Sequence, residues 1–347
     1  MKKIKMLVVP MILAVVLTAC SGSEQKNKVA TIEVKDGSYV QLDGSSDKET
    51  VELDVKLKNN SDNKFIVMED SFYLVEKGND EKIKEKDMTS GDLITTDIYK
   101  SIINGDLSPE KSLSGKIFFD IKKDTEYSLF FTSHSFEEKT GKSHDDVEIP
   151  LDLKKFEDSK KSLDEPIKAL NAYIDEVLLN KENKDYEKLV ENDKTKEKEL
   201  IKNAFSKEFT NFMFSGNSSD EQINKLFEQY TKAQSSHFKV ETELDTRLSD
   251  VAIINAKMTG INSESISAGI LKVKTEYYDK TGDFDQEKEN EYAVNNFEKV
   301  LKDAKVGHLT DTKITLTKEK DKWKIAMDTD KLYENKKLIS SYLGSNY

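Results

Sequence analysis

The chain has 347 residues and a formal net charge of −12, and Arg247 is the only arginine among its 54 basic residues. Its length is sufficient for two ordinary domains with hydrophobic cores. Nucleic acids and anionic lipid surfaces are bound mainly through basic patches, in which arginine supplies bidentate contacts. The composition therefore argues against nucleic acid as a partner and against electrostatic adhesion to a membrane.

The first twenty residues have the order of a secretory signal peptide. Lysines at positions 2, 3 and 5 precede an apolar run over 6–16, which is too short to span a bilayer comfortably. The run leads to Leu17-Thr-Ala-Cys20, which resembles the lipobox of bacterial lipoproteins. The resemblance implies a signal peptide over 1–19 and acylation of the Cys20 thiol at the mature N-terminus. The alternative is an ordinary signal peptide followed by an incidental cysteine.

This assignment predicts where the protein is located. Two or three acyl chains are enough for stable anchoring, so we expect the chain at the outer face of the cell membrane, facing the cell wall. Cys20 is the only cysteine, so the mature chain has no free thiol for a disulfide, a nucleophile or a metal. No later hydrophobic segment approaches the length of a membrane span.

The pattern after the anchor predicts a short tether and an all-β domain. Residues 20–28 contain no apolar residue after Cys20 and are interpreted as the tether. Over 29–154 short segments alternate polar and apolar residues and are separated by Asn, Asp and Gly clusters, as in a β-sandwich or barrel. The clearest alternation is Val51, Leu53, Val55 and Leu57.

Three segments of this domain look like a known module. They are Leu57-Lys-Asn-Asn-Ser-Asp-Asn-Lys-Phe65, Asp70-Ser-Phe-Tyr-Leu-Val75, and Gly105–Ser112 followed by Gly115–Asp120. They resemble the telokin-like, immunoglobulin-like domain of lipoproteins from Gram-positive bacteria. The resemblance implies an immunoglobulin-like sandwich over 29–154 and a display or binding role, without agreed catalytic residues.

Beyond a charged linker at 155–162, the apolar period changes from two to 3.6 residues. Three helices are predicted, on the apolar stripes 167–178, 201–213 and 223–230. Ser162 with Glu165, and Ser218 with Glu221, are spaced like capping boxes, and Pro166 lies in the first turn.

Strands are predicted to follow these helices. The expected strands are 238–244, 251–258, Ile270–Tyr278, 312–317 and 323–327, interrupted by a helix over 292–301. Helices followed by antiparallel strands indicate an α+β domain over 163–330, with helices packed on a curved sheet. Residues 331–347 are interpreted as a C-terminal tail or short helix.

Two segments of the second domain carry a further resemblance. Lys318-Glu-Lys-Asp-Lys-Trp323-Lys-Ile325 looks like the last hairpin of nuclear-transport-factor-2-like domains, and Tyr277–Phe284 precedes a helix as in lipoprotein domains of that superfamily. The resemblance implies a cone between helices and sheet. Because that superfamily contains both enzymes and inert partners, the fold does not choose between them.

Aromatic residues are the main candidates for lining such a cone. Tyr173, Phe205, Phe209, Tyr277 and Trp323 lie on elements expected to converge on one interior. At helical or strand spacing such residues usually form a core, and the alternative is an apolar cavity that takes a small ligand.

The histidines offer weaker candidates. His134, His144 and Asp145 flank a polar loop whose closure could bring them onto a divalent ion, although their spacing matches no preorganised ligand pattern. The alternative is a solvated loop. His237 is interpreted as the start of a strand, on the polar face shared with Lys239 and Glu241, which points it away from a pocket.

These observations favour a non-enzymatic binding or interaction module, because no convergent catalytic set and no phosphate-binding loop is found. No cofactor is predicted. Beyond the membrane, the expected partner is another cell-envelope or host protein, or a small apolar ligand. The alternatives are an enzyme or ligand-processing module that uses the cone pocket, and a metal-binding lipoprotein.

Overall fold

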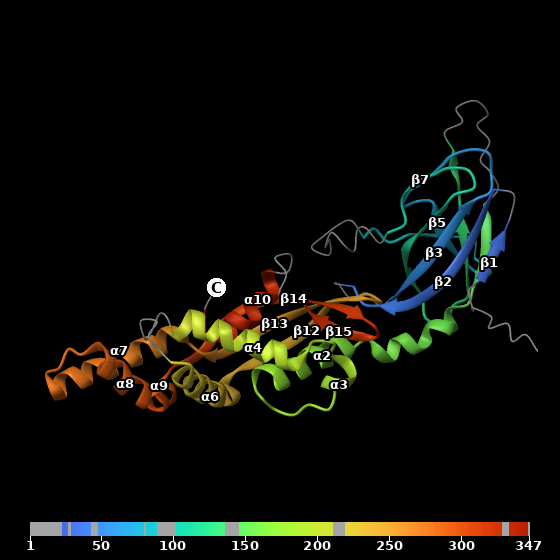
Figure 1. The fold of residues 1–347 in the computed structure, drawn as a ribbon. Helices are drawn as coiled ribbons and strands as arrows, with labels where there is room; N and C mark the ends of the chain where they lie inside the picture. The colour runs from blue at the N-terminus through green and yellow to red at the C-terminus, as the bar shows by residue number, and fades with distance from the viewer. Residues whose placement is uncertain are drawn as a thin grey trace, which may run out of the picture.

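The computed structural model describes residues 23–26, 29–42, 48–79, 81–88, 102–135, 146–210, 219–327 and 333–345. Figure 1 shows an elongated molecule. An all-β first domain lies at one end, and a second domain of helices and one sheet extends away from it.

The first domain consists of antiparallel strands in three sheets. One sheet has the order β1-β2-β3-β8, with bounds Ser23–Lys26, Ala30–Val40, Glu49–Asn59 and Ser112–Ile121. The second has the order β11-β9-β5-β6, with bounds Val147–Leu151, Tyr127–Phe131, Phe72–Glu76 and Lys82–Lys84. The small third sheet has the order β10-β4-β7, with bounds His134–Ser135, Phe65–Val67 and Gly105–Leu107.

The alternating pattern of β3 confirms the predicted all-β class. Successive side chains of a strand point to opposite faces, and Val51, Leu53, Val55 and Leu57 are all fully buried on one of them. They share a core with side chains of the facing sheet, such as Leu129 of β9. The first hydrophobic core therefore lies between the two four-stranded sheets.

The segments expected to be tether and linker carry regular structure. Ser23–Lys26 pairs with Thr31–Val34 as the edge strand β1. The residues expected to form the linker, 155–162, lie in the 3₁₀ helix η1, which spans Leu153–Ser162. Its Phe156 packs on β2, where an added Cβ at Gly37 would lie 2.6 Å from the ring. Only glycine at this position allows so close an approach.

The second domain has one antiparallel sheet in the order β12-β13-β14-β15. Its strands span Lys239–Arg247, Val251–Ile261, Val306–Glu319 and Lys322–Ile325. Four of the five predicted strands correspond to these elements, which confirms a mixed helix-and-sheet domain.

The helical elements precede, interrupt and follow the sheet. Before it come α2 (Glu165–Tyr173), η2 (Ile174–Leu178), α3 (Tyr186–Leu189), α4 (Lys194–Ala204), η3 (Phe205–Thr210) and α6 (Asp220–His237). Between β13 and β14 come α7 (Ser263–Thr281), α8 (Gln286–Asn295) and α9 (Phe297–Asp303), and α10 (Tyr333–Tyr342) closes the chain.

The predicted strand Ile270–Tyr278 is wrong, because these residues belong to helix α7. Its buried residues Ile266, Ile270 and Val273 recur at helical spacing. Asn262 caps the N-terminus by accepting a hydrogen bond from the Ser265 backbone N–H, and Gly282 ends the helix in the left-handed conformation.

The N-terminal caps of α2 and α6 differ from those predicted. Before α2 the N-cap residue is Asp164, which makes no side-chain cap, and the Ser162 hydroxyl donates instead to the Ser159 carbonyl. Helix α6 has a complete capping box, one residue later than predicted, between Ser219 and Gln222. The position of Pro166 in the first turn of α2 is confirmed.

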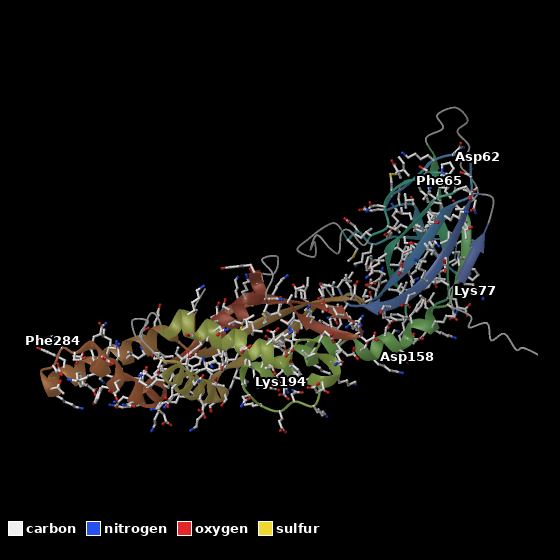
Figure 2. The ribbon with its side chains drawn as sticks, viewed as in Figure 1. Asp62, Phe65, Lys77, Asp158, Lys194 and Phe284 are labelled. Carbon is white, nitrogen blue, oxygen red and sulfur yellow. The ribbon has the colours of Figure 1, made fainter. Side chains whose placement is uncertain are left out.

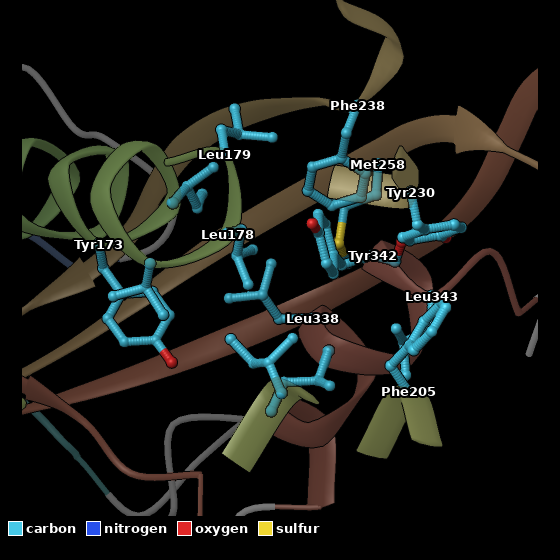
Figure 3. Close-up of a cluster of buried hydrophobic side chains, with 14 of the residues drawn as sticks. Tyr173, Leu178, Leu179, Phe205, Tyr230, Phe238, Met258, Leu338, Tyr342 and Leu343 are labelled. Atoms are coloured by element: carbon cyan, nitrogen blue, oxygen red, sulfur yellow. The ribbon is translucent and has the colours of Figure 1, made fainter. Parts of the chain in front are cut away.

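The C-terminal helix α10 belongs to the second core, beyond the domain boundary expected at 330. Its Leu338 and Tyr342 are fully buried there (Figure 3). The Asn335 side chain donates to the Thr315 carbonyl at 2.8 Å and accepts from the Thr315 backbone N–H at 2.8 Å. Asn192 bonds Ile325 of β15 in the same way, at 2.7 and 2.9 Å. Two buried amides thus satisfy backbone groups that the sheet leaves unpaired.

Candidate functional site

The space between helices and sheet in the second domain is filled by side chains. Tyr173, Phe205 and Trp323, three of the predicted pocket-lining residues, are fully buried in one hydrophobic cluster. Figure 3 shows Tyr173 and Phe205 among aliphatic and aromatic neighbours. Of the other two, the Phe209 side chain lies outside the described residues, and Tyr277 is partly exposed on α7, 5.4 Å from the Tyr292 ring centroid. The structure therefore separates Tyr277 from the three buried rings.

The hydroxyl groups in this interior serve as hydrogen-bond donors. The Tyr173 hydroxyl donates to Glu197 Oε2 at 2.9 Å, and the Tyr230 hydroxyl donates to the Tyr342 carbonyl at 2.7 Å. Burial raises the pKa of both tyrosines well above the usual value. Both hydroxyls therefore stay protonated at neutral pH and tie the helices together.

The proposed metal ligands fall largely beyond what the structure describes. His144 and Asp145 lie outside the described residues, and of His134 only the backbone is described, in β10 opposite Ile66. Within the described ranges no cluster of three or more His, Cys, Asp or Glu residues could hold a metal ion. The neighbouring Asp146 accepts hydrogen bonds from the hydroxyls of Tyr73 and Thr132. The metal hypothesis stays a prediction.

The interpretation of His237 as the first residue of a strand was wrong. It is the last residue of α6 and is exposed, so it does not share a strand face with Lys239 and Glu241. His308 lies on β14 with its Nε2 atom 3.8 Å from Asp311 Oδ1.

A groove of about 660 Å³ crosses the sheet of the second domain. Three residues each from β12, β13 and β14, together with Glu334 of α10, line it. Six of them carry their side chains on the face opposite the core: Glu241, Glu243, Asn255, Lys257, Asp311 and Lys313. The Thr312 hydroxyl donates to Glu334 Oε2 at 2.6 Å, so these two residues lie on the other face of the sheet. The charged residues around the groove therefore do not all share one face.

The two domains are joined by backbone pairing. The Gln41 N–H donates to the Arg247 carbonyl at 2.9 Å, and the Arg247 N–H donates to the Gln41 carbonyl at 2.7 Å. Gln41 follows β2 of the first domain, and Arg247 ends β12 of the second. A separate apolar cluster, to which Phe118 of β8 and Leu248 belong, packs beside this bridge.

A partly buried ion cluster reinforces this junction. Lys116 Nζ of β8 lies 2.9 Å from Glu52 Oε1 of β3 and 2.7 Å from Asp250 Oδ1 of the second domain. Glu52 also accepts hydrogen bonds from the backbone N–H and the hydroxyl of Ser249. Burial works to lower the pKa of Lys116, but the two carboxylates outweigh it and raise that pKa. The cluster thus links charged groups of both domains.

The sole arginine lies at the centre of this contact. Arg247 is 2% exposed, and its guanidinium reaches the hydroxyls of Ser38 in β2 and Ser162 in η1, each at 3.4 Å. It also lies 5.9 Å from the centre of the Trp323 ring. Burial lowers the pKa of Arg247, opposed by the carboxylates of Glu52, Glu165 and Asp250. In the sequence, the signal for this role was that Arg247 is the only arginine of a lysine-rich chain.

Glu85 in the first domain should make the stability of the protein depend on pH. Its Oε2 atom is buried without a hydrogen-bond partner among the described residues, and burial together with Glu69 raises the pKa of Glu85 to about 9. When the pKa of a carboxyl group is higher in the folded than in the unfolded state, the protein loses stability as pH rises. For Glu85 this loss extends from the pKa of the unfolded state to about 9. We expect Glu85→Gln to raise the free energy of unfolding at pH 8 by about 1 kcal/mol or more, since one pKa unit corresponds to ~1.4 kcal/mol. Thermal unfolding at pH 5 and pH 8 measures this.

The matched control is Glu126→Gln, which removes an exposed carboxylate whose pKa its partner Lys77 lowers. We expect little change there, because an ion pair exposed to solvent contributes little to stability. Equal responses of both variants to pH would contradict the assignment to Glu85.

The sequence family described as "Domain of unknown function (DUF5105)" matches residues 156–343, more than half of the chain. The chain belongs to this family. The DUF5105 region begins within η1 and includes α10, in agreement with the core to which that helix contributes. A second family, "Domain of unknown function (DUF4352)", matches residues 21–142 in the first domain.

Similarity to known lipoproteins extends over both domains. The uncharacterized lipoprotein YcdA of Bacillus subtilis is 24% identical, with 96% of each chain covered. The crystal structure of ycdA from Bacillus subtilis subsp. subtilis matches with a TM-score of 0.56 and 23% identity, over 92% of this chain and 98% of that chain. The DUF5105 chain therefore shares the two-part fold of that structure.

These findings confirm the predicted resemblance to Gram-positive bacterial lipoproteins. The description of the Bacillus subtilis relative as a lipoprotein implies a membrane-anchored location at the cell surface. Cys20, the predicted acylation site, lies outside the described residues. Within the described part of this DUF5105 chain, no helix combines the length and the apolar character needed to cross a membrane.

Proposed function

We propose that this protein is a lipid-anchored extracellular lipoprotein that acts as a non-enzymatic binding or interaction module, facing the cell wall. Its first domain would be an immunoglobulin-like, telokin-like sandwich. Its second would be a nuclear-transport-factor-2-like domain whose cone is closed. The partner would be another envelope or host protein, or a small ligand held at the surface.

The packing of the second domain carries the proposal. The interior in which an enzyme of this shape would bind its substrate contains Tyr173, Phe205 and Trp323, each fully buried. Their hydroxyl and ring contacts are internal, as in the bond between Tyr173 and Glu197. A packed core leaves no room for a substrate beside them.

The junction gives further support. Backbone pairing between Gln41 and Arg247 and the buried pair of Lys116 with Glu52 favour a fixed arrangement of the two domains. Such an arrangement suits a protein that presents a surface at a set distance from its anchor. An enzyme that closes on substrate would instead need a hinge.

Lipid anchoring is tested by Cys20→Ala. We expect the variant to leave the membrane fraction for the medium, or to accumulate as an unprocessed precursor, because the acyl chains supply the membrane affinity. Fractionation followed by immunoblotting measures the distribution, with Ser21→Ala as a control that stays membrane-bound. A correctly cleaved Cys20→Ala variant that remains firmly on the membrane would refute the anchor.

The binding role is tested with purified residues 21–347 and isolated cell envelopes. We expect saturable co-sedimentation with the envelopes and no change in the composition of their glycan, peptide or lipid components. Turnover of an envelope component that one point substitution abolishes would establish the enzyme alternative instead. A thermal shift with excess zinc, lost on replacement of His134 and His144, would establish the metal-binding alternative.

A further inference from the structure

The end of the second domain carries exposed apolar side chains. Phe284 is 81% exposed, Leu271 67% and Tyr278 40%, which are high values for large apolar residues. They lie on α7 and on the turn that leads into α8. Figure 1 places these helices at the end of the molecule farthest from the first domain, and Figure 2 labels Phe284 there. We call residues 277–292 the distal tip.

The aromatic rings of the distal tip form an ordered surface. The ring centroids of Tyr278 and Phe284 lie 4.3 Å apart, and those of Tyr277 and Tyr292 lie 5.4 Å apart. The turn is held by Asp285, whose carboxylate accepts hydrogen bonds from the first backbone N–H groups of α8. The rings are therefore presented to solvent on a fixed support, which lowers the entropic cost of binding.

The charge around these rings is strongly acidic. Residues 277–292 contain six acidic residues and two lysines. Lys288 is held by Asp283 and Asp285 at 3.0 and 3.5 Å, and Lys280 donates to the Tyr292 hydroxyl at 3.0 Å. Both lysines are thus bound to side chains of the distal tip itself, and the surface of the tip carries a net negative charge.

We propose that the distal tip docks a cationic amphipathic polypeptide segment, with apolar side chains flanked by lysine or arginine. This inference rests on the proposed binding function and names its partner class. The apolar side chains would cover Phe284 and Tyr278 and remove their apolar surface from water. The cations would meet the acidic rim and the faces of the rings. An anionic lipid surface would be repelled by the same charge.

The test uses purified residues 21–347 and a fluorescein-labelled synthetic peptide that forms an amphipathic helix, with leucines on one face and lysines on the other. We expect Tyr278→Ala/Phe284→Ala to weaken binding at least tenfold in fluorescence anisotropy, and raised salt to weaken binding to the unchanged protein. Glu287→Lys/Glu291→Lys should also weaken it several-fold. The control Tyr333→Ala removes another exposed aromatic, 57% exposed and outside the tip, and should leave the affinity unchanged.

Three results would overturn the inference. They are absence of peptide binding, equal binding by the tip variant and the unchanged protein, and tip-dependent binding to phosphatidylglycerol vesicles instead of the peptide. An unchanged circular dichroism spectrum and melting temperature show that each variant is folded. Because envelope turnover is measured separately, failure of the distal tip and failure of the non-enzymatic proposal give different results.

Discussion

Lys116→Met is expected to lower the free energy of unfolding by about 3 kcal/mol, the effect of removing one partner of a buried ion pair. The substitution leaves the Glu52 carboxylate, whose side chain is only 4% exposed, without its ion-pair partner. Among the described residues it keeps the hydrogen bonds from Ser249 and the more distant charge of Arg247. Urea unfolding of purified residues 21–347 measures the change. Trp323, the only tryptophan, reports on the second domain by fluorescence, while circular dichroism reports on both domains.

The two probes also test the coupling between domains. We expect coincident transitions in the unchanged protein and separate ones in Lys116→Met, because the cluster joins the domains. Lys77→Met is the control and should cost little stability, since its pair with Glu126 is exposed on both sides. If both variants lose the same stability, the cluster is not the link.

Trp323→Ala is expected to destabilise the protein by about 3–5 kcal/mol through a cavity in the second core. The residue is fully buried in that core, and it also lies beside Arg247 at the junction. Thermal unfolding followed by circular dichroism measures the loss. The variant also tests the closed cone, because an open pocket would tolerate the smaller side chain.

Two controls separate packing from polarity in this experiment. Trp323→Phe should cost much less than the alanine change, because it keeps most of the volume and removes an indole N–H that has no partner among the described residues. Phe284→Ala, at an 81% exposed position, should change stability by less than about 0.5 kcal/mol. A small loss in Trp323→Ala would contradict a packed interior.

The first domain could largely be predicted from its sequence. In β3 the alternation of Val51, Leu53, Val55 and Leu57 with polar residues is a local property, and it sets which face is buried. The helix α2 was likewise predictable from its apolar stripe and Pro166. These signals lie within one element and need no knowledge of its neighbours.

Helix α7 was missed because part of its sequence also favours a β-strand. Residues 270–278 are rich in β-branched and aromatic side chains, which favour a strand. The helical solution buries Ile266, Ile270 and Val273 together, and the Asn262 cap and Gly282 fix both ends. Leu271 and Tyr278 are left exposed as a result. The helical packing of α7 therefore explains both why the strand prediction was wrong and why Tyr278 is exposed at the distal tip.

The junction could not be predicted from sequence. Gln41 and Arg247, or Lys116 and Asp250, are separated by more than one hundred residues, and no local pattern relates them. Tyr173, Phe205 and Trp323 lie together in one core cluster. Whether that interior is open or filled depends on side-chain volumes from many elements, including α10.

The backbone bridge between Gln41 and Arg247 also determines how tension would travel through the molecule. With the N-terminal end fixed and a partner pulling at the far helices, load would enter near β2, which runs directly into Gln41. It would then cross to β12 through two hydrogen bonds in parallel with η1. The tension would therefore be carried both by the covalent chain through η1 and by the two hydrogen bonds between Gln41 and Arg247. The hydrogen bonds would break first.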